Sequence, residues 1–117
     1  MSNLPAFSEP LENFLNKKGT LEEYLIVDFW APWCMPCRVL DPVVEELSND
    51  YRGKIGFYQI DADVHPKIAR EYEVLGIPTL AFLKADNGKY SVEELGRIVG
   101  VQPKHRIEEK IKEYFYS

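Results

Sequence analysis

The sequence has few cysteines, no cluster of basic residues and no long apolar run. Only two of its 117 residues are cysteines, Cys34 and Cys37. No basic cluster is longer than Lys17–Lys18, and the net charge is −5, so a surface that follows nucleic-acid phosphates is excluded. The longest apolar stretch, residues 24–33, is interrupted by Asp28 and is shorter than the roughly 18 residues that a membrane span needs. We therefore expect neither nucleic acid nor a membrane as a partner.

The chain is long enough to form a core without covalent cross-links. A chain of 117 residues, 45% of them hydrophobic, fits a single domain over residues 1–117 that removes about two thirds of its unfolded surface from water. Residues 1–5 lack the basic start and apolar stretch of a secretory signal, which predicts a cytoplasmic location. In a reducing compartment, a lone cysteine pair is more often catalytic, redox-sensing or metal-binding than structural.

Apolar patterns of helical and extended type alternate along the chain. Ser8 can cap a first helix that ends before Gly19. Strands are predicted over residues 25–30, 55–60, 79–83 and 95–99, the last one antiparallel. Helices are predicted from near Cys34, over residues 66–73 and from Pro103. The stripe expected to be buried in the long helix consists of Val39, Leu40, Val43, Val44 and Leu47. This order predicts an α/β protein with a mixed sheet and helices on both faces.

The two cysteines lie where a buried strand gives way to the long helix. Free backbone N–H groups and the positive end of the helix dipole stabilise a thiolate there, so we expect Cys34 to have a lowered pKa and to be the nucleophile. Cys37 lies about one turn further along the same face, within reach of a disulfide. Closing so short a loop stabilises the fold by only about 2 kcal/mol, which suits a reversible bond better than a structural one. Pro36 fits the first helical turn, where its missing N–H costs nothing.

Two other interpretations of the pair stay open. The cysteines could be half of a zinc site, although His65 and His105 lack the usual ligand spacing. They could also be two inert buried residues, although Trp33 and Pro36 favour an exposed corner.

Asp28 interrupts an otherwise apolar strand. A buried carboxylate without a partner is costly or stays protonated because its pKa rises. Asp28 could therefore accept the proton of Cys37 when that thiol attacks, directly or through a water molecule. The alternative is a structural aspartate whose oxygens accept hydrogen bonds from the backbone.

Several motifs in order along nearly the whole chain resemble the thioredoxin family. Residues 27–37 read V-D-F-W-A-P-W-C-M-P-C, and Pro42 and the segments 60–63, 76–79 and 99–100 follow. The resemblance implies a three-layer α/β/α fold with a central five-stranded mixed sheet and four helices, the first strand near Asn3–Phe7. It also implies a cis Ile77–Pro78 bond facing the cysteines. A shallow apolar site for target peptides is implied at Trp33, Met35, Pro36, Ile77, Pro78, Gly100 and Val101. Apolar residues such as Val101 could instead be ordinary core.

Three positions depart from the family pattern. Met35 stands where glycine is usual, which can alter target fit and the redox poise of the disulfide. Gln59 stands where many bacterial members have lysine, so Asp28 would lack a nearby cation. The stretch Ala85–Glu94 is longer than the family hairpin and is interpreted as either a partner-specific loop or a neutral insertion.

These observations predict a protein-disulfide reductase that works by dithiol–disulfide exchange. Cys34 attacks a target disulfide, Cys37 resolves the mixed disulfide, and Asp28 assists the second step. We expect a monomer without bound cofactor or metal, acting on disulfide-containing target proteins and reduced by a thioredoxin reductase. The alternatives are an oxidant or isomerase of protein disulfides on the same fold, and a non-catalytic docking module.

Overall fold

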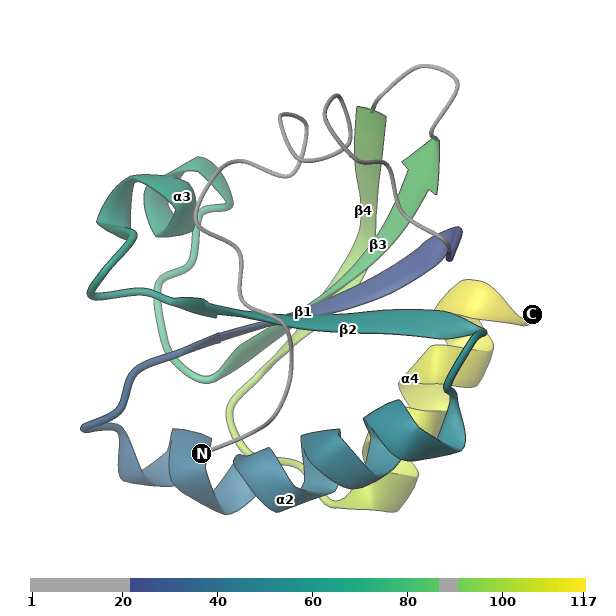
Figure 1. Cartoon of the computed structure of the whole chain (residues 1–117), viewed down its shortest axis with the longest axis horizontal. Coiled ribbons are helices and arrows are strands. Elements are labelled where there is room, and N and C mark those ends of the chain that lie inside the picture. Colours follow the sequence, from purple (N-terminus) through teal and green to yellow (C-terminus); the bar gives the residue numbers. More distant parts are fainter. Residues whose placement is uncertain (1–21, 87–90) are drawn as a thin grey trace.

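The computed structural model describes residues 22–86 and 91–117. Along the chain, its elements are β1 (Tyr24–Trp30), α2 (Met35–Asp50), β2 (Ile55–Asp61), α3 (Pro66–Glu71), β3 (Thr79–Asp86), β4 (Ser91–Val99) and α4 (Lys104–Phe115). The four strands form one sheet in the order β2-β1-β3-β4 (Figure 1). β1 pairs with β2 in parallel, whereas β3 is antiparallel to both of its neighbours. The predicted mixed sheet is therefore confirmed.

The described residues contain four strands and three helices, whereas the resemblance implied five strands and four helices. The expected first strand near Asn3–Phe7 and the helix that Ser8 would cap lie outside the described residues. No helix within residues 22–86 and 91–117 is both long and apolar enough to cross a membrane.

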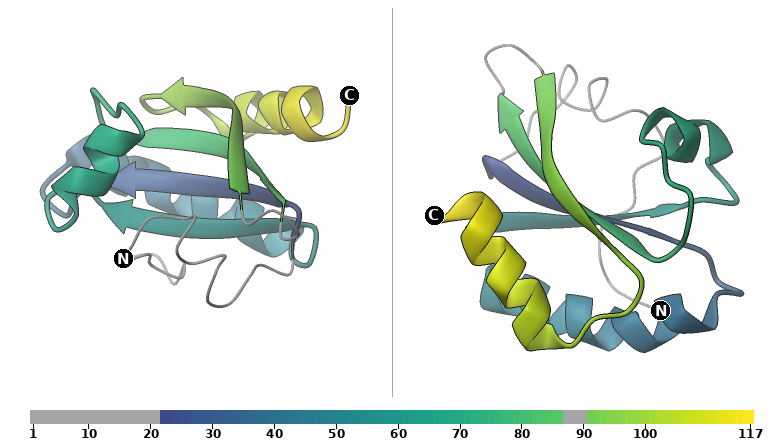
Figure 2. Two further views of the ribbon diagram at one scale, coloured as in Figure 1. Left: turned by 90° about the horizontal axis from the view of Figure 1, so that it is seen from above. Right: turned by 180° about the vertical axis from the view of Figure 1, so that it is seen from behind.

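Alternation along β1 divides the core between the two faces of the sheet. Leu25, Val27 and Phe29 pack with residues of α3, whereas Ile26 packs with residues of α2 and α4. Figures 1 and 2 show α2 and α4 on one side of the sheet and α3 on the other. Both faces of β1 are buried, as its nearly continuous apolar sequence predicts.

Helix α2 begins next to the cysteines, as predicted. One residue of its expected apolar stripe is exposed instead of buried. Leu40, Val44 and Leu47 are buried, whereas Val39 is exposed. Val39 directly precedes Leu40 and is turned by about 100° from it around the helix axis, which takes it off the core-facing stripe. In α4 the prediction is confirmed, because Ile107, Ile111 and Phe115 are all buried.

The stretch Ala85–Glu94 is not a long loop, which corrects that interpretation. β3 continues to Asp86 and β4 begins at Ser91, and the two strands pair down to Asp86 opposite Ser91. A register shift next to Phe82 and Leu83 interrupts the pairing. Backbone hydrogen bonds between antiparallel strands do not require apolar side chains on both faces, so the ribbon extends beyond the apolar residues that mark it.

Candidate active site

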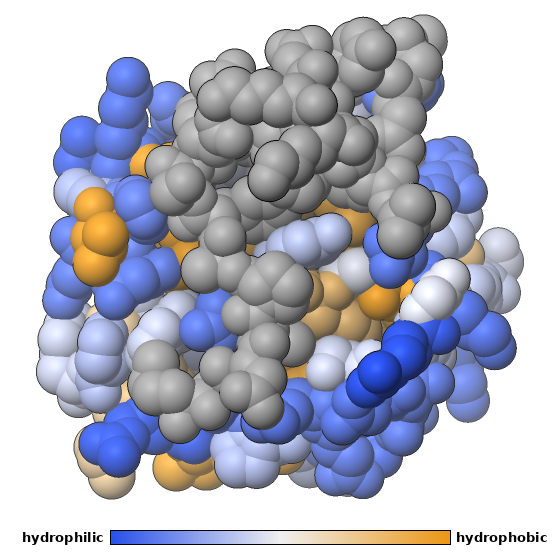
Figure 3. Space-filling model, in the orientation of Figure 1, coloured by the Kyte–Doolittle hydropathy of each residue, from blue (hydrophilic) through white to orange (hydrophobic). Residues whose placement is uncertain are grey.

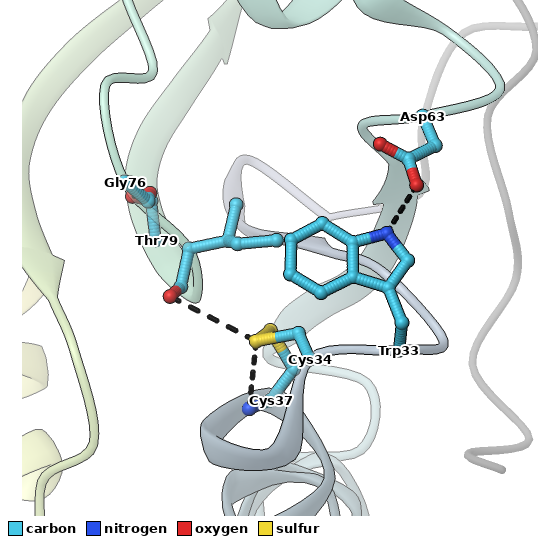
Figure 4. The surroundings of a disulfide bond; sticks show 7 residues. Trp33, Cys34, Cys37, Asp63, Gly76 and Thr79 are labelled. Carbon is cyan, nitrogen blue, oxygen red and sulfur yellow. Dashed lines mark hydrogen bonds between the residues drawn. A yellow bond between two sulfur atoms is a disulfide. The ribbon is translucent and has the colours of Figure 1, made fainter.

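Cys34 and Cys37 form a disulfide at the first turn of α2. Cys34 is the N-cap residue of the helix, and the two Cα atoms lie 5.3 Å apart. The Sγ atom of Cys34 accepts a hydrogen bond from the backbone N–H of Cys37 at 3.2 Å (Figure 4). The predicted disulfide geometry is thus confirmed, and the helix start directs a donor at the sulfur of Cys34. The lowered pKa of the Cys34 thiol stays a prediction, since a disulfide does not titrate.

The sulfur pair is covered, although its neighbours are exposed. Cys34 and Cys37 expose only 4% and 3% of their surface. Trp33, Met35 and Pro36 are exposed, as expected of a strand-to-helix corner. The prediction of an exposed corner therefore holds for the residues around the disulfide and is wrong for the cysteines themselves.

The segment before β3 closes one side of the disulfide. The Ile77–Pro78 peptide bond is cis, as the resemblance implied. The Sγ atom of Cys34 lies 3.9 Å from the carbonyl oxygen of Ile77 (Figure 4), and Ile77 packs against the cluster that Ala31 forms with the two cysteines. The carbonyl oxygen of Pro78 accepts a hydrogen bond from the N–H of Gly100 at 2.8 Å. The fold therefore brings the segments 77–78 and 99–100 together beside the cysteine pair.

The residues expected to form an apolar surface differ in exposure. Trp33, Met35, Pro36 and Val101 are exposed, Ile77 and Gly100 are half-buried, and Pro78 is buried. Because Val101 exposes 41% of its surface, the alternative that it belongs to the core is wrong. Exposed apolar residues outside the expected set include Val64, Leu75 and Val99. A Cβ atom on Gly76 would lie 3.6 Å from Val99, so Leu75 and Val99 lie on neighbouring segments. Figure 3 shows hydrophobic areas at the left edge and in the middle of one face, with hydrophilic residues around them.

The indole of Trp33 is held by the segment that follows β2. Its Nε1–H donates to a carboxylate oxygen of Asp63 (Figure 4). Asp61 orders that segment, because its Oδ1 accepts hydrogen bonds from the N–H groups of Asp63 at 2.9 Å and Val64 at 3.2 Å. The sequence motif over residues 60–63 therefore positions an exposed aromatic side chain next to Cys34.

Asp28 is buried on the side of the sheet that faces α2. It exposes 3% of its surface, and burial, with a smaller contribution from the negative charge of Asp41, raises its pKa to about 7. Within the described part of the chain, its Oδ1 atom has no hydrogen-bond partner. Gln59 is its register neighbour on β2. The alternative of a structural aspartate bonded to backbone donors is therefore not supported at Oδ1.

A cavity of about 240 Å³ connects Asp28 with the second cysteine. Its lining residues are Asp28, Trp30, Cys37, Arg38, Asp41 and Pro42. The structure thus brings Asp28 and Cys37 to one cavity, as predicted. Asp41 was missed by the sequence reasoning, although its position four residues after Cys37 places it on the same side of α2.

The residues that the structure describes include no group of three or more histidine, cysteine, aspartate or glutamate side chains that could hold a metal ion. With both sulfurs joined in a disulfide, the pair as observed offers no thiolate for zinc.

Comparison with known proteins gives a consistent result. The family model described as Thioredoxin matches residues 7–113. A chloroplastic M-type thioredoxin of Pisum sativum is 41% identical over 93 residues, which make up 80% of this chain and 51% of the relative. A thioredoxin of Staphylococcus aureus is 40% identical over 89 residues, covering 76% of this chain and 80% of the relative. The chain thus spans about half the length of the chloroplastic relatives that it matches.

Solved structures agree with these sequence comparisons. The thioredoxin of Trichomonas vaginalis superimposes with a TM-score of 0.79 at 26% identity, covering 97% of this chain and 99% of the other. Thioredoxin NaTrxh of Nicotiana alata gives a TM-score of 0.77 at 32% identity, with 97% and 93% covered.

Proposed function

Because the chain belongs to the thioredoxin family, we propose that it is a thiol–disulfide oxidoreductase that reduces disulfides in target proteins. The observation that carries this proposal is the Cys34–Cys37 disulfide at the start of α2, where the N–H of Cys37 points at the sulfur of Cys34. The same hydrogen bond and the helix dipole stabilise negative charge on Cys34 once the disulfide is reduced.

The first step is attack by the Cys34 thiolate on a target disulfide. A bond forms between Cys34 Sγ and one target sulfur, and the other target sulfur leaves as a thiolate with the electron pair of the broken bond. The covered position of Cys34 requires the target to approach along the open side of the site. Trp33, Met35 and Val101 are exposed around that approach and offer apolar contact.

The second step regenerates the disulfide and releases the target. Cys37 gives its proton to Asp28 and attacks Cys34 Sγ, and the second target sulfur departs as a thiolate. Each cycle transfers two electrons from the dithiol to the target. The cavity shared by Asp28 and Cys37 supports this role, since it can hold a water molecule between carboxylate and thiol.

The backbone next to the cis bond is the proposed docking point for the target. The Ile77 carbonyl oxygen lies 3.9 Å from Cys34 Sγ, so a peptide that lies along this segment places its own sulfur next to Cys34. Pro36, Pro78 and Gly100 complete the proposed surface for an extended, disulfide-containing peptide.

The reduced form must be restored by an external donor. A thioredoxin reductase is the proposed donor, and it returns two electrons and two protons to the Cys34–Cys37 disulfide. We place this chemistry in the cytoplasm, where thiols are kept reduced, and we propose that the chain works as a monomer.

The direction of exchange separates a reductant from an oxidant or isomerase. Met35 lies between the cysteines, and residues beside a redox pair tune its reduction potential. This residue is the reason to consider an oxidant or isomerase as the alternative. The potential of the Cys34–Cys37 couple, measured against glutathione, decides the question. A couple more reducing than glutathione supports the reductase, and a more oxidising one supports the alternative.

An insulin-reduction assay and a trapping variant test the activity. The wild-type chain should precipitate reduced insulin in the presence of dithiothreitol, and a Cys34→Ser variant should not. A Cys37→Ser variant should accumulate mixed disulfides with target proteins through Cys34, because no second thiol resolves them. Absence of adducts despite a reactive Cys34 would contradict the assigned roles. Partner binding that persists in a Cys34→Ser/Cys37→Ser variant, together with an inactive wild type, would identify a docking module instead.

A further inference from the structure

The cavity beside Asp28 contains a second carboxylate. Asp41 lies four residues after Cys37 in α2, about one turn further along the same side of the helix. It lines the same cavity of about 240 Å³ as Asp28 and Cys37. Asp28 is buried and its Oδ1 has no partner among the described residues, whereas Asp41 is only half-buried. The cavity therefore holds a covered carboxylate, a cysteine and a carboxylate nearer to solvent.

Building on the proposed function, we propose that Asp41 is a positioning residue for proton transfer. Its negative charge in the shared cavity keeps a proton on Asp28 in the resting protein, and thereby sets the pH range in which Cys37 can resolve the mixed disulfide.

The charges around Asp28 are consistent with this role. Two carboxylates that share a poorly solvated cavity disfavour simultaneous ionisation. On α2, the charged or titratable residues that line the cavity are Asp41, Arg38 and Cys37, and Arg38 is exposed. On the neighbouring strands, the register partners of Asp28 are the uncharged Gln59 and Leu80. Burial comes first and Asp41 second among the causes that raise the pKa of Asp28 to about 7.

The proton balance explains why this charge matters for turnover. Only ionised Asp28 can take the proton of the Cys37 thiol, after which the Cys37 sulfur bonds to Cys34 and the target thiolate leaves. At pH 6, a carboxyl with a pKa of about 7 is ionised in about a tenth of the molecules. Removal of the Asp41 charge increases that fraction, so resolution by Cys37 becomes faster at low pH.

The first test compares Asp41→Asn with a matched control, Glu46→Gln. Glu46 is also on α2 and also carries one negative charge, but it pairs with Lys104 instead of lining the cavity. The titration of Asp28 is followed through its carboxyl carbon by NMR. We expect its midpoint to fall in Asp41→Asn and to stay at the wild-type pH in Glu46→Gln and in Asp41→Glu, which restores the charge. Should Asn disturb the helix, Asp41→Ser replaces it.

The second test isolates the Cys37 step. Reduced protein is mixed with 5,5′-dithiobis(2-nitrobenzoate) in a stopped-flow instrument. The first thionitrobenzoate is released when Cys34 attacks, and the second when Cys37 resolves the adduct. At pH 6, the second release should be about fivefold faster in Asp41→Asn than in wild type if the ionised fraction of Asp28 rises to about one half, and equal at pH 8.5.

The outcomes separate this inference from the function on which it rests. Superimposable Asp28 titrations and pH profiles in wild type and Asp41→Asn, with insulin reduction intact, would overturn the role of Asp41 and leave the reductase standing. Loss of the second thionitrobenzoate release in the wild type would overturn the proposed function itself.

Discussion

Leu75 exposes 99% of its surface directly before the segment that faces the cysteines. It contributes almost nothing to the core, and a single exposed leucine is common on protein surfaces, so its position has to carry the argument. Val99 lies on the neighbouring segment and is also exposed. We predict that Leu75 contacts the target protein, because it directly precedes the segment that lies beside Cys34.

Replacing Leu75 by serine should weaken target binding and leave the chemistry intact. Loss of about 1 kcal/mol of apolar contact corresponds to an increase of about fivefold in KM for a protein disulfide, with kcat unchanged. The rate with 5,5′-dithiobis(2-nitrobenzoate), which is too small to reach Leu75, should not change. Tyr116→Ser, at an exposed apolar residue near the chain end, is the control. Equal KM values for Leu75→Ser and wild type would exclude the contact.

The residues of the site differ in how readily they can be predicted from the sequence. Asp28 could be found because a carboxylate is conspicuous in an apolar strand, and Cys34 because the start of a helix follows it. Asp41 and Leu75 could not be found, since a carboxylate on a helix and a leucine before a turn are ordinary on a protein surface. Only the tertiary arrangement places Asp41 in the cavity with Asp28.

At the scale of the elements, β4 and α4 pack closely against each other at Gly96. A Cβ atom on Gly96 would come within 3 Å of the ring of Tyr114, because the backbone of β4 leaves no room there. Tyr114 itself packs on Phe82, with the ring centroids 5.1 Å apart. Glycine at this position therefore permits an aromatic contact between helix and sheet.

Gly96→Ala should lower the free energy of unfolding by about 1–2 kcal/mol, because the Tyr114 ring must move away from Phe82. The effect is measured by urea unfolding. Combined with Tyr114→Ala, which removes the obstructing ring, Gly96→Ala should cost much less than it does alone. Strictly additive effects in this double-mutant cycle would show that the two residues do not compete for space.

Arg97 connects β4 with the end of α3. Its Nη1 and Nη2 atoms donate to the carbonyl oxygens of Glu73 at 3.1 Å and Tyr72 at 2.6 Å, and Glu94 holds the guanidinium in place. These carbonyl groups follow the last turn of a short helix, where the helix itself supplies no donor. The arginine thereby fixes the start of the segment that leads to Ile77 and Pro78.

Arg97→Met should destabilise the fold by roughly 2 kcal/mol, since two carbonyl groups lose a charged donor. Amide hydrogen exchange at Glu73 and Val74 should accelerate, and exchange in α4 should not. Arg106→Met provides the comparison, because the ion pair of Arg106 with Glu109 is exposed and contributes little. Similar losses of stability in the two variants would argue against a specific role for Arg97.

Most elements could be predicted because their apolar residues follow one period. β1 and β2 have continuous apolar runs, and α4 places Ile107, Ile111 and Phe115 on one stripe. The full β3–β4 ribbon was not predicted, since the outer part of β4 is exposed or half-buried and a register shift next to Phe82 and Leu83 interrupts the pairing. Side-chain patterns carry little information about pairing of that kind.

For the whole molecule, Asp28 makes stability depend on pH. The pKa of its carboxyl is raised from 3.8 to about 7 in the folded state. Folding favours the protonated form of Asp28. The contribution of Asp28 to the free energy of unfolding is therefore fully present below pH 3.8 and is lost as the pH rises through about 7. The loss amounts to at most about 4 kcal/mol, at about 1.4 kcal/mol for each pKa unit.

Asp28→Asn removes this dependence, because an amide does not ionise. Urea unfolding of the oxidised protein should show that the variant gains stability over the wild type between pH 4.5 and pH 8, approaching 4 kcal/mol at most. Other titrating groups are common to both proteins and cancel in the difference. Parallel stability curves for the two proteins would contradict the burial of an ionisable Asp28.

The covered disulfide has a consequence for electron flow in the cell. Under the proposed function, a protein whose surface fits the surrounding side chains delivers its sulfur to Cys34 in a larger share of encounters than a small thiol that meets the covered disulfide by chance. We therefore expect the oxidation state of the chain to follow its encounters with matching proteins more closely than the equilibrium with small thiols. The chain and the small-thiol pool can then have different redox states in one compartment.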